Sequence, residues 1–304
     1  MRQFFRTLWL VITAPFRFLI WLFKKITNSI RNFFLQFRDF FANEPEDEPI
    51  GETIGKVAQD PRGLLPHLDA LRKHLFRAVI FFGLTTTLSF TFANQILNFL
   101  ARPLPNGVDS IQAIEVSEPI SVLMRISLLS GFAIALPYIV LELVLFVGPG
   151  LHRRTRVFLL VFGIPSATFL FILGMLFAFY VMLPAALPFL LGILDFQTNI
   201  RASSYIKFVT GVMFWIGIVF QLPLVIYVIA RIGLVTPSIL IKQWRLAIIV
   251  IAVIAAMITP TVDPVNMAIV MAPLILLYFL SIGLAFIAQR GRTPRASSDI
   301  TPSQ

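Results

Sequence analysis

The chain contains no cysteine among its 304 residues, and only 13% of its residues are charged. Without a thiol, a disulfide framework, a zinc–thiolate site and a thiol nucleophile are all excluded. The charged fraction is about half of the roughly 25% that is usual in a soluble domain. Hydrophobic residues make up 58% of the chain, and the mean hydropathy is +0.86. A water-soluble globule of this composition would expose too much apolar surface, so that class of protein is excluded.

Histidine is also scarce, and nucleotide-binding motifs are missing. The three histidines (His67, His74 and His152) are too few and too scattered to suggest a metal centre. No Gly-x-x-x-x-Gly-Lys loop or Gly-x-Gly-x-x-Gly turn marks a nucleotide site. We therefore expect no metal, no cofactor and no enzymatic activity. In an apolar chain, the net charge of +10 indicates membrane topology and attraction to anionic lipid rather than nucleic-acid binding.

The main feature of the sequence is a series of long apolar segments. About 20 apolar residues can cross a hydrocarbon core about 30 Å thick. Because the apolar runs are continuous rather than alternating at period two, they predict helices and not a transmembrane barrel. The predicted fold class is all-α, a polytopic membrane protein with six transmembrane helices at about 75–100, 120–147, 157–183, 205–230, 244–259 and 266–288. We expect the fifth and sixth helices to be short.

The distribution of positive charges predicts on which side of the membrane each loop lies. One set of loops and helix ends carries most of the cations: Arg72, Lys73, Arg77, Arg153, Arg154, Arg156, Arg231, Lys242, Arg245, Arg290, Arg292 and Arg295. The opposite loops carry mainly acids: Asp109, Glu115, Glu118, Asp195 and Asp263. Cationic loops stay in the cytoplasm. The pattern therefore predicts a multi-pass protein of the cytoplasmic (inner) membrane with both termini cytoplasmic.

The first 43 residues are crowded with phenylalanine and tryptophan, and their cations share one face. At 100° per residue, these cations fall within about 60° of one another on a helical wheel: Arg2, Arg6, Arg17, Lys24, Arg31 and Arg38. The pattern is typical of an amphipathic helix in the membrane interface, kinked at Pro15. Arg17 interrupts the apolar run and no small-x-small site follows, which disfavours a signal peptide. A seventh span at Leu8–Phe23 is an alternative.

The next segment is acidic and contains several prolines and glycines. Residues 44–63 read as a solvated linker, in which the acidic run Glu44–Glu48 is a candidate contact for a partner. We divide the chain into an aromatic and basic membrane-interface segment at 1–43, the linker at 44–63, a six-helix membrane domain at 64–290 and a cytoplasmic tail at 291–304.

Several short motifs follow one another through the six-helix domain. The first is His67-Leu68-Asp69-Ala70-Leu71-Arg72, and the second is Phe146-Val147-Gly148-Pro149-Gly150-Leu151. Further pieces complete the series: Arg102-Pro103-Leu104, Pro137, Phe220-Gln221-Leu222-Pro223, Thr259 to Pro264, and Ala272 to Tyr278. In order and spacing these motifs resemble those of the TatC family, the six-helix core subunit of the twin-arginine protein translocase. The family's first signature runs His-Leu-x-Glu-Leu-Arg, and its cytoplasmic turn runs Phe-x-x-Pro-Gly-Leu.

The resemblance implies a non-enzymatic scaffold that docks folded precursors through their twin-arginine signal peptides. It also implies single-span partner subunits of the TatA and TatB type, export driven by the proton motive force, and a larger complex in which a homo-oligomer is left open. The implied cytoplasmic docking residues are His67, Leu68, Asp69, Ala70, Leu71, Arg72, Phe146, Pro149, Gly150, Leu151 and Thr155. The implied partner-helix residues are Glu142, Gln221 and Pro223, and the outer-loop residues are Pro103, Leu104, Glu118 and Asp263.

Four acidic positions of the family are neutral here. They are Ala70 in the signature, Thr155 after the turn, Gln221 in helix four and Phe279 in helix six. Paired arginines need carboxylates, ideally in bidentate contact. The losses therefore leave open a divergent paralogue that keeps the scaffold but not twin-arginine recognition. Asp69 is next to Ala70, but one residue along a helix rotates the side chain by about 100°. A small-solute transporter is disfavoured, because paired intramembrane charges are scarce and no inverted repeat is visible.

Two polar side chains are expected inside the bilayer. Glu142 lies in the inner half of helix two, where a carboxylate is costly and is therefore functional or paired, with Arg77 or Arg125 as candidate partners. Gln221 lies near mid-membrane. Pro223 removes the backbone hydrogen bond to the carbonyl of Val219, so the glutamine amide is expected either to satisfy that carbonyl or to dock a partner helix.

The charge pattern predicts the side of every loop. Reporter fusions after Asn106, Asp195 and Asp263 should report an external location, and fusions after His152, Ile239 and Thr293 an internal one. A single loop that reproducibly reports the opposite side would contradict the six-span assignment.

The aromatic segment yields a second prediction. A peptide of residues 1–43 should bind anionic vesicles as a helix, and rising salt should weaken binding because the cations share one face. Replacing Arg17, Lys24, Arg31 and Arg38 by glutamine should remove most of that salt dependence. Circular dichroism on vesicles checks the helix. A peptide that stays unstructured, or that spans the bilayer, would rule out the interfacial helix.

Overall fold

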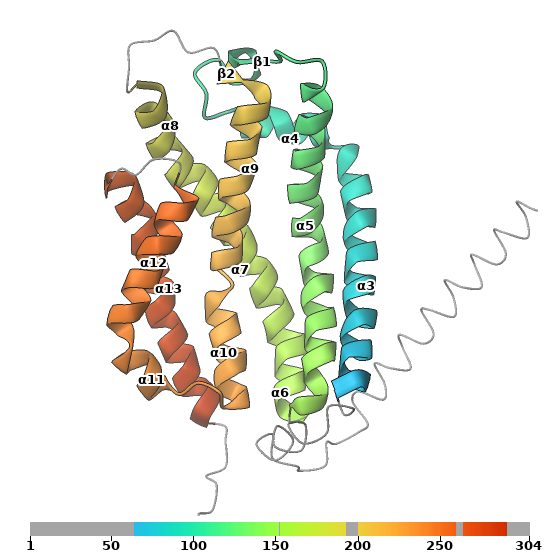
Figure 1. The fold of residues 1–304 in the computed structure, drawn as a ribbon, viewed down its shortest axis with the longest axis vertical. Helices are drawn as coiled ribbons and strands as arrows, with labels where there is room; N and C mark the ends of the chain where they lie inside the picture. Colours follow the sequence, from blue (N-terminus) through green and yellow to red (C-terminus); the bar gives the residue numbers. More distant parts are fainter. Residues whose placement is uncertain (1–63, 152, 193–199, 260–263, 291–304) are drawn as a thin grey trace, which may run out of the picture.

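The computed structural model describes residues 64–151, 153–192, 200–259 and 264–290. The predictions for the interfacial segment, the linker, Asp263 and the C-terminal tail lie outside the described residues. Within them the chain forms a bundle of helices with a two-residue strand pair at one end (Figure 1).

The described residues form six apolar helical segments in the predicted order: four are long enough to cross a membrane, a bent pair is a candidate fifth span, and one is shorter. The first is a bent pair, α3 (Leu64–Phe90) and α4 (Ala93–Leu100), whose axes differ by 77°. The second is α5 (Glu118–Val147). The third runs continuously through α6 (Arg153–Phe158), a π-helical turn (Leu159–Gly163), α7 (Ile164–Phe177), a second π-helical turn (Ala178–Met182) and α8 (Leu183–Gly192).

The remaining passes follow in order. The fourth consists of α9 (Ala202–Val219) and α10 (Leu222–Ile232), and the short α11 (Pro237–Lys242) leads to α12 (Trp244–Ile258) and α13 (Pro264–Arg290). The fifth pass, α12, is short at 15 residues, as predicted. The prediction of a short sixth helix is wrong, because α13 has 27 residues. This helix begins at Pro264 and continues past the apolar run to Arg290.

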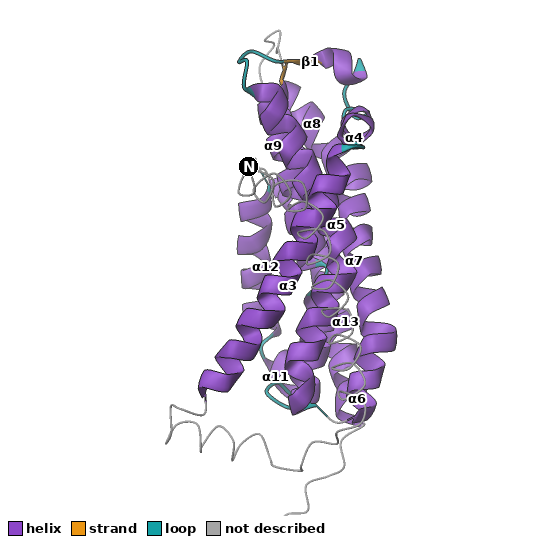
Figure 2. Ribbon diagram, turned by 90° about the vertical axis from the view of Figure 1, so that its right-hand side faces the viewer, coloured by secondary structure: helices purple, strands orange, loops and turns teal. Residues whose placement is uncertain are grey.

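The two ends of the bundle differ in structure and charge (Figure 2). One end holds α4 and the parallel pair of β1 (Ile111–Gln112) with β2 (Ile200–Arg201), and the other holds α6 and α11. We call the second one the basic end, because exposed cations gather there: Arg72, Lys73, Arg153, Arg154, Lys242 and Arg245.

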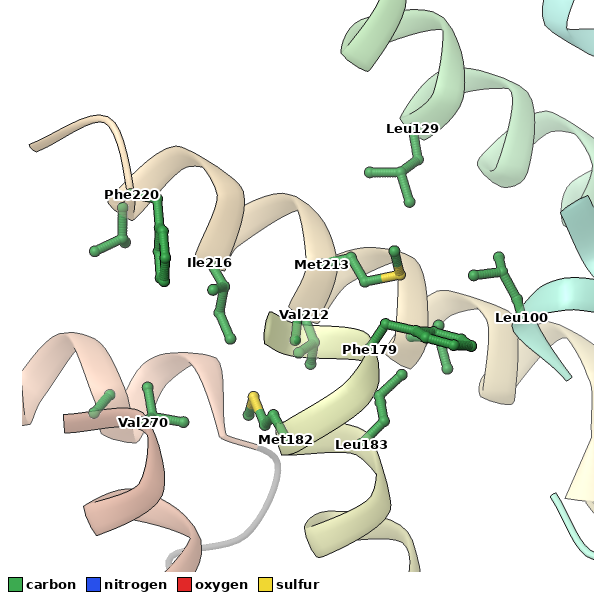
Figure 3. Packing of buried hydrophobic residues seen from close by; sticks show 14 of the residues in the cluster. Leu100, Leu129, Phe179, Met182, Leu183, Val212, Met213, Ile216, Phe220 and Val270 are labelled. Carbon is green, nitrogen blue, oxygen red and sulfur yellow. The ribbon is translucent and has the colours of Figure 1, made fainter. Parts of the chain in front are cut away.

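The centre of the bundle is apolar. Leu100 of α4, Leu129 of α5 and Val270 of α13 pack with residues of α9 such as Met213 and Ile216 in one buried cluster (Figure 3). Many large apolar side chains outside this cluster are exposed. That distribution suits a protein whose outer surface contacts lipid.

Helices α3 and α5 approach each other through small residues. Ser127, Gly131 and Ala135 of α5 are buried at four-residue spacing. A Cβ atom at Gly131 would lie 2.6 Å from the Cα atom of Thr86 on α3, so only glycine fits there. The Thr85 hydroxyl also donates a hydrogen bond of 2.9 Å to the Gly131 carbonyl. Lipid gives helices no hydrophobic reason to associate, so close packing of this kind holds them together.

This contact predicts different outcomes for two equivalent substitutions. Gly131→Ala should destabilise the full-length protein in detergent by about 1–3 kcal/mol, the usual cost of overpacking. Gly83→Ala, in the facing helix α3, is the matched control, because nothing lies within 4 Å of its added Cβ. Thermal unfolding followed by circular dichroism measures both variants. Equal melting temperatures for the two would contradict the close approach of α3 and α5.

Candidate functional site

The two best-defined sequence motifs meet at the basic end. The ring of His67, in the first turns of α3, lies 4.6 Å from the ring of Phe146, near the end of α5. The ring of His74, two helical turns later on the same face, lies 6.1 Å from Phe146. The signature of residues 67–72 is therefore helical, and it starts beside the turn of residues 146–151.

A buried carboxylate fastens these two helices. Glu142 of α5 is 2% exposed, and its Oε2 lies 2.5 Å from His74 Nδ1 and 3.8 Å from Arg77 Nη1. The Tyr138 hydroxyl donates a hydrogen bond of 2.7 Å to Oε1. Of the two candidate partners, Arg77 lies beside Glu142 and Arg125 forms no ion pair with it. A buried carboxylate with partners on both oxygens is satisfied, so Glu142 joins α3 to α5 rather than facing a ligand.

The signature residues point in different directions. Leu68, Asp69, Leu71 and Arg72 are exposed, whereas Ala70 is half-buried. Asp69 is two residues from His67, about 200° around the helix, and so lies away from α5. Its carboxylate is 3.5 Å from Lys73 Nζ. Ala70 is about 60° from His67 and therefore flanks the α3–α5 contact. Asp69 thus does not occupy the place of the missing signature glutamate.

Thr155 is buried inside the bundle. It is 2% exposed, and its hydroxyl accepts a hydrogen bond of 2.8 Å from Arg231 Nε. Arg231 Nη1 donates another of 2.8 Å to the carbonyl of Ala288, so one guanidinium links α6, α10 and α13. The prediction of Thr155 as a docking residue is therefore corrected, because the guanidinium of Arg231 holds this position inside the bundle.

The Pro-Gly-Leu turn is partly buried. Gly148–Gly150 form a short 3₁₀ turn, in which Pro149 is exposed. Leu151 is 3% exposed and packs with Val144 and Tyr227. Its carbonyl accepts a hydrogen bond of 2.8 Å from Arg156 Nε. Phe146, Pro149 and the exposed α3 residues remain on the surface of the basic end.

Gln221 lies at the break between α9 and α10. Its Nε2 donates a hydrogen bond of 2.9 Å to the carbonyl of Ala167 in α7. The expectation that the amide satisfies the Val219 carbonyl is therefore wrong, because the side chain reaches a neighbouring helix instead. Pro223 is buried in the first turn of α10. The amide joins the broken fourth pass to the third.

The candidate outer-loop residues hold the opposite end together. Glu118, 2% exposed, pairs with the Arg201 guanidinium, which also lies 2.6 Å from Glu115. Both carboxylates raise the pKa of Arg201 above its ordinary value. Leu104 is buried and Pro103 half-buried. In the described part of the chain, no group of three or more His, Cys, Asp or Glu side chains could hold a metal.

The sequence analysis did not predict four of these partners, namely His74, Tyr138, Arg201 and Arg231. His74 and Arg77 lie three residues apart on one helix face, and Tyr138 lies one turn before Glu142, so the spacing carried a signal for that cluster. Arg231 and Arg201 act on residues distant in the sequence, and no local pattern indicates their partners.

Comparison with known proteins shows which family has this sequence and fold. The family model for the Sec-independent protein translocase protein TatC matches residues 66–273. A TatC protein of Aquifex aeolicus is 36% identical over 236 residues, covering 75% of this chain and 96% of the relative, and one of Koribacter versatilis is 32% identical over 248 residues, covering 79% and 91%.

The fold agrees with the sequence match. A crystal structure of the twin-arginine translocase receptor TatC superposes with a TM-score of 0.61 at 34% identity, covering 74% of this chain and all of the other. The chain therefore belongs to the TatC family, the core subunit of the Sec-independent protein translocase.

Proposed function

We propose that the basic end receives the twin-arginine signal peptides of folded precursor proteins, and that single-span partner subunits dock against the membrane-embedded helices. The observation that carries this proposal is the contact of His67 with Phe146, which brings the two family motifs to one surface. The exposed residues of that surface are Leu68, Asp69, Leu71, Arg72 and Pro149.

The orientation follows from charge. Exposed cations concentrate at the basic end, whereas Glu115, Glu118 and Asp109 lie at the opposite end. Since cationic ends are retained in the cytoplasm, the proposal places the basic end, and with it both termini, on the cytoplasmic side of the inner membrane.

Charge also limits recognition of paired arginines. Among the described residues of the basic end, the carboxylates are Asp69, exposed and paired with Lys73, and the buried Glu142. Arg153 and Arg154 are exposed close to the turn and repel an incoming guanidinium. The second candidate function, a TatC-like scaffold without twin-arginine recognition, is favoured by one observation: Thr155 is neutral, buried and bonded to Arg231.

The structure predicts different effects on peptide affinity for a glutamate restored at position 70 and one restored at position 155. Ala70→Glu places a carboxylate beside the α3–α5 contact, and a charge-assisted bond is worth roughly 1.5–3 kcal/mol before desolvation. If half of that is retained, affinity for a twin-arginine peptide should rise about 3- to 12-fold. Thr155→Glu, the matched comparison, places its carboxylate beside Arg231 and should change affinity less than about twofold. Fluorescence anisotropy with a labelled peptide and the full-length protein in detergent measures both variants.

The peptide itself supplies the specificity control. A twin-lysine peptide should gain little from Ala70→Glu, because an ammonium group lacks the planar fork of guanidinium. An equal gain for both peptides would mean nonspecific charge attraction. If the unmodified protein binds the two peptides equally, the scaffold without twin-arginine recognition is the better account. A gain from Thr155→Glu as large as that from Ala70→Glu would contradict the buried pairing.

A further inference from the structure

Two cations lie on membrane-spanning helices away from the basic end, and their side chains have no ion-pair or hydrogen-bond partner among the described residues. Arg125 of α5 and Lys207 of α9 are both exposed, and neither side chain forms a hydrogen bond or ion pair with the described part of the chain. Of the other charges within the spans, Arg72, Arg153 and Arg154 are exposed at the basic end, whereas Glu142 and Arg231 are bonded to neighbouring helices. An unpartnered cation on a membrane-facing surface is costly unless its side chain reaches the polar interface or pairs with an anion from outside the chain.

The two cations lie at the same depth. The ion pair of Arg201 with Glu118 joins the starts of α9 and α5, and both helices run from there toward the basic end (Figure 1). Arg125 follows Glu118 by seven residues, and Lys207 follows Arg201 by six. At 1.5 Å per residue both lie about 10 Å from that ion pair.

The two cations also share one seam. The rings of Phe132 on α5 and Phe214 on α9 are 5.1 Å apart, which marks where these helices face each other. Arg125 and Lys207 each precede one of these rings by seven residues. Seven residues return to the same helix face within about 20°. Because α5 and α9 run in the same direction, both cations lie along the α5–α9 seam, two turns nearer the opposite end.

The seam between the cations and the rings is apolar and partly open. A Cβ atom at Gly211 of α9 would meet nothing within 4 Å. Leu128 on α5 and Trp215 on α9 are exposed, Trp215 by 56%. We define the lipid seam as Arg125, Lys207, Leu128, Gly211 and Trp215. Cations thus lie above a shallow apolar strip on the outside of the bundle.

We propose that the lipid seam binds an anionic phospholipid, with the phosphate between Arg125 and Lys207 and an acyl chain along Leu128, Gly211 and Trp215. The passes of α5 and of Ala202–Ile232 have 30 and 31 residues, about 45 Å, and so exceed a 30 Å hydrocarbon core by about 7–8 Å at each end. The cations therefore lie close to the hydrocarbon boundary, within reach of phosphates by extension of their side chains.

Depth favours a lipid over a partner helix. Phosphates are present at this level of the membrane, whereas a partner carboxylate at the same level has to be carried below the surface at a desolvation cost. The anion also screens the mutual repulsion of the two cations, which is strong where water is scarce.

The role of Arg125 and Lys207 in lipid binding is tested with full-length protein in phosphatidylcholine nanodiscs that contain increasing amounts of phosphatidylglycerol. Native mass spectrometry measures how much phosphatidylglycerol the protein retains. Arg125→Gln with Lys207→Gln should weaken phosphatidylglycerol binding at least tenfold. Lys242→Gln with Arg245→Gln removes two exposed cations from the basic end and should change binding less than twofold. Circular dichroism verifies that each variant is folded. Unchanged phosphatidylglycerol binding in the Arg125–Lys207 variant overturns the proposal.

The apolar strip is tested separately. Gly211→Leu should fill the strip and weaken phosphatidylglycerol binding several-fold, whereas Gly283→Leu, also at an open position, should not. If glycerophosphoglycerol, the headgroup alone, binds as tightly as the intact lipid, the site takes a small anion and the lipid proposal is wrong. The proposal also fails if an acidic single-span partner helix, and not phosphatidylglycerol, stabilises the unmodified protein but not the Arg125–Lys207 variant.

Discussion

The buried carboxylate of Glu142 determines how the basic end is built. A charge at this depth persists only if its oxygens are bonded, and three of its neighbours, His74, Arg77 and Tyr138, meet that requirement. Since two of them belong to α3, the cluster fixes both the rotation and the height of α3 against α5. That placement brings His67 to Phe146 and leaves Asp69 facing away.

The rest of the bundle depends on similar polar links between helices. Lipid tails are as apolar as the side chains that face them, so burial of leucine does not drive helices together. Gln221 joins the third and fourth passes near their middle, and Tyr205 donates a hydrogen bond of 2.7 Å to the carbonyl of Leu100 at the opposite end. The close approach at Gly131 supplies packing between these levels.

Hydropathy and charge predict much of this architecture. Six passes, their order and the short α12 follow from local composition, and the cost of a buried charge predicts a partner for Glu142, with Arg77 as one of two candidates. The partners of Thr155 and Gln221 could not be predicted, because Arg231 and Ala167 lie 76 and 54 residues away in the sequence. The length of α13 was underestimated because hydropathy marks the apolar centre of a helix and not its polar ends. The bend between α3 and α4 had no proline to indicate it.

The break at Gln221 has a consequence for protonation. A primary amide neither gains nor loses a proton in the physiological range, so the middle of the fourth pass keeps one charge state whatever the pH on either side. The hydrogen bond from Gln221 to the Ala167 carbonyl therefore persists when the pH on either side of the membrane changes, and so does the link between the third and fourth passes.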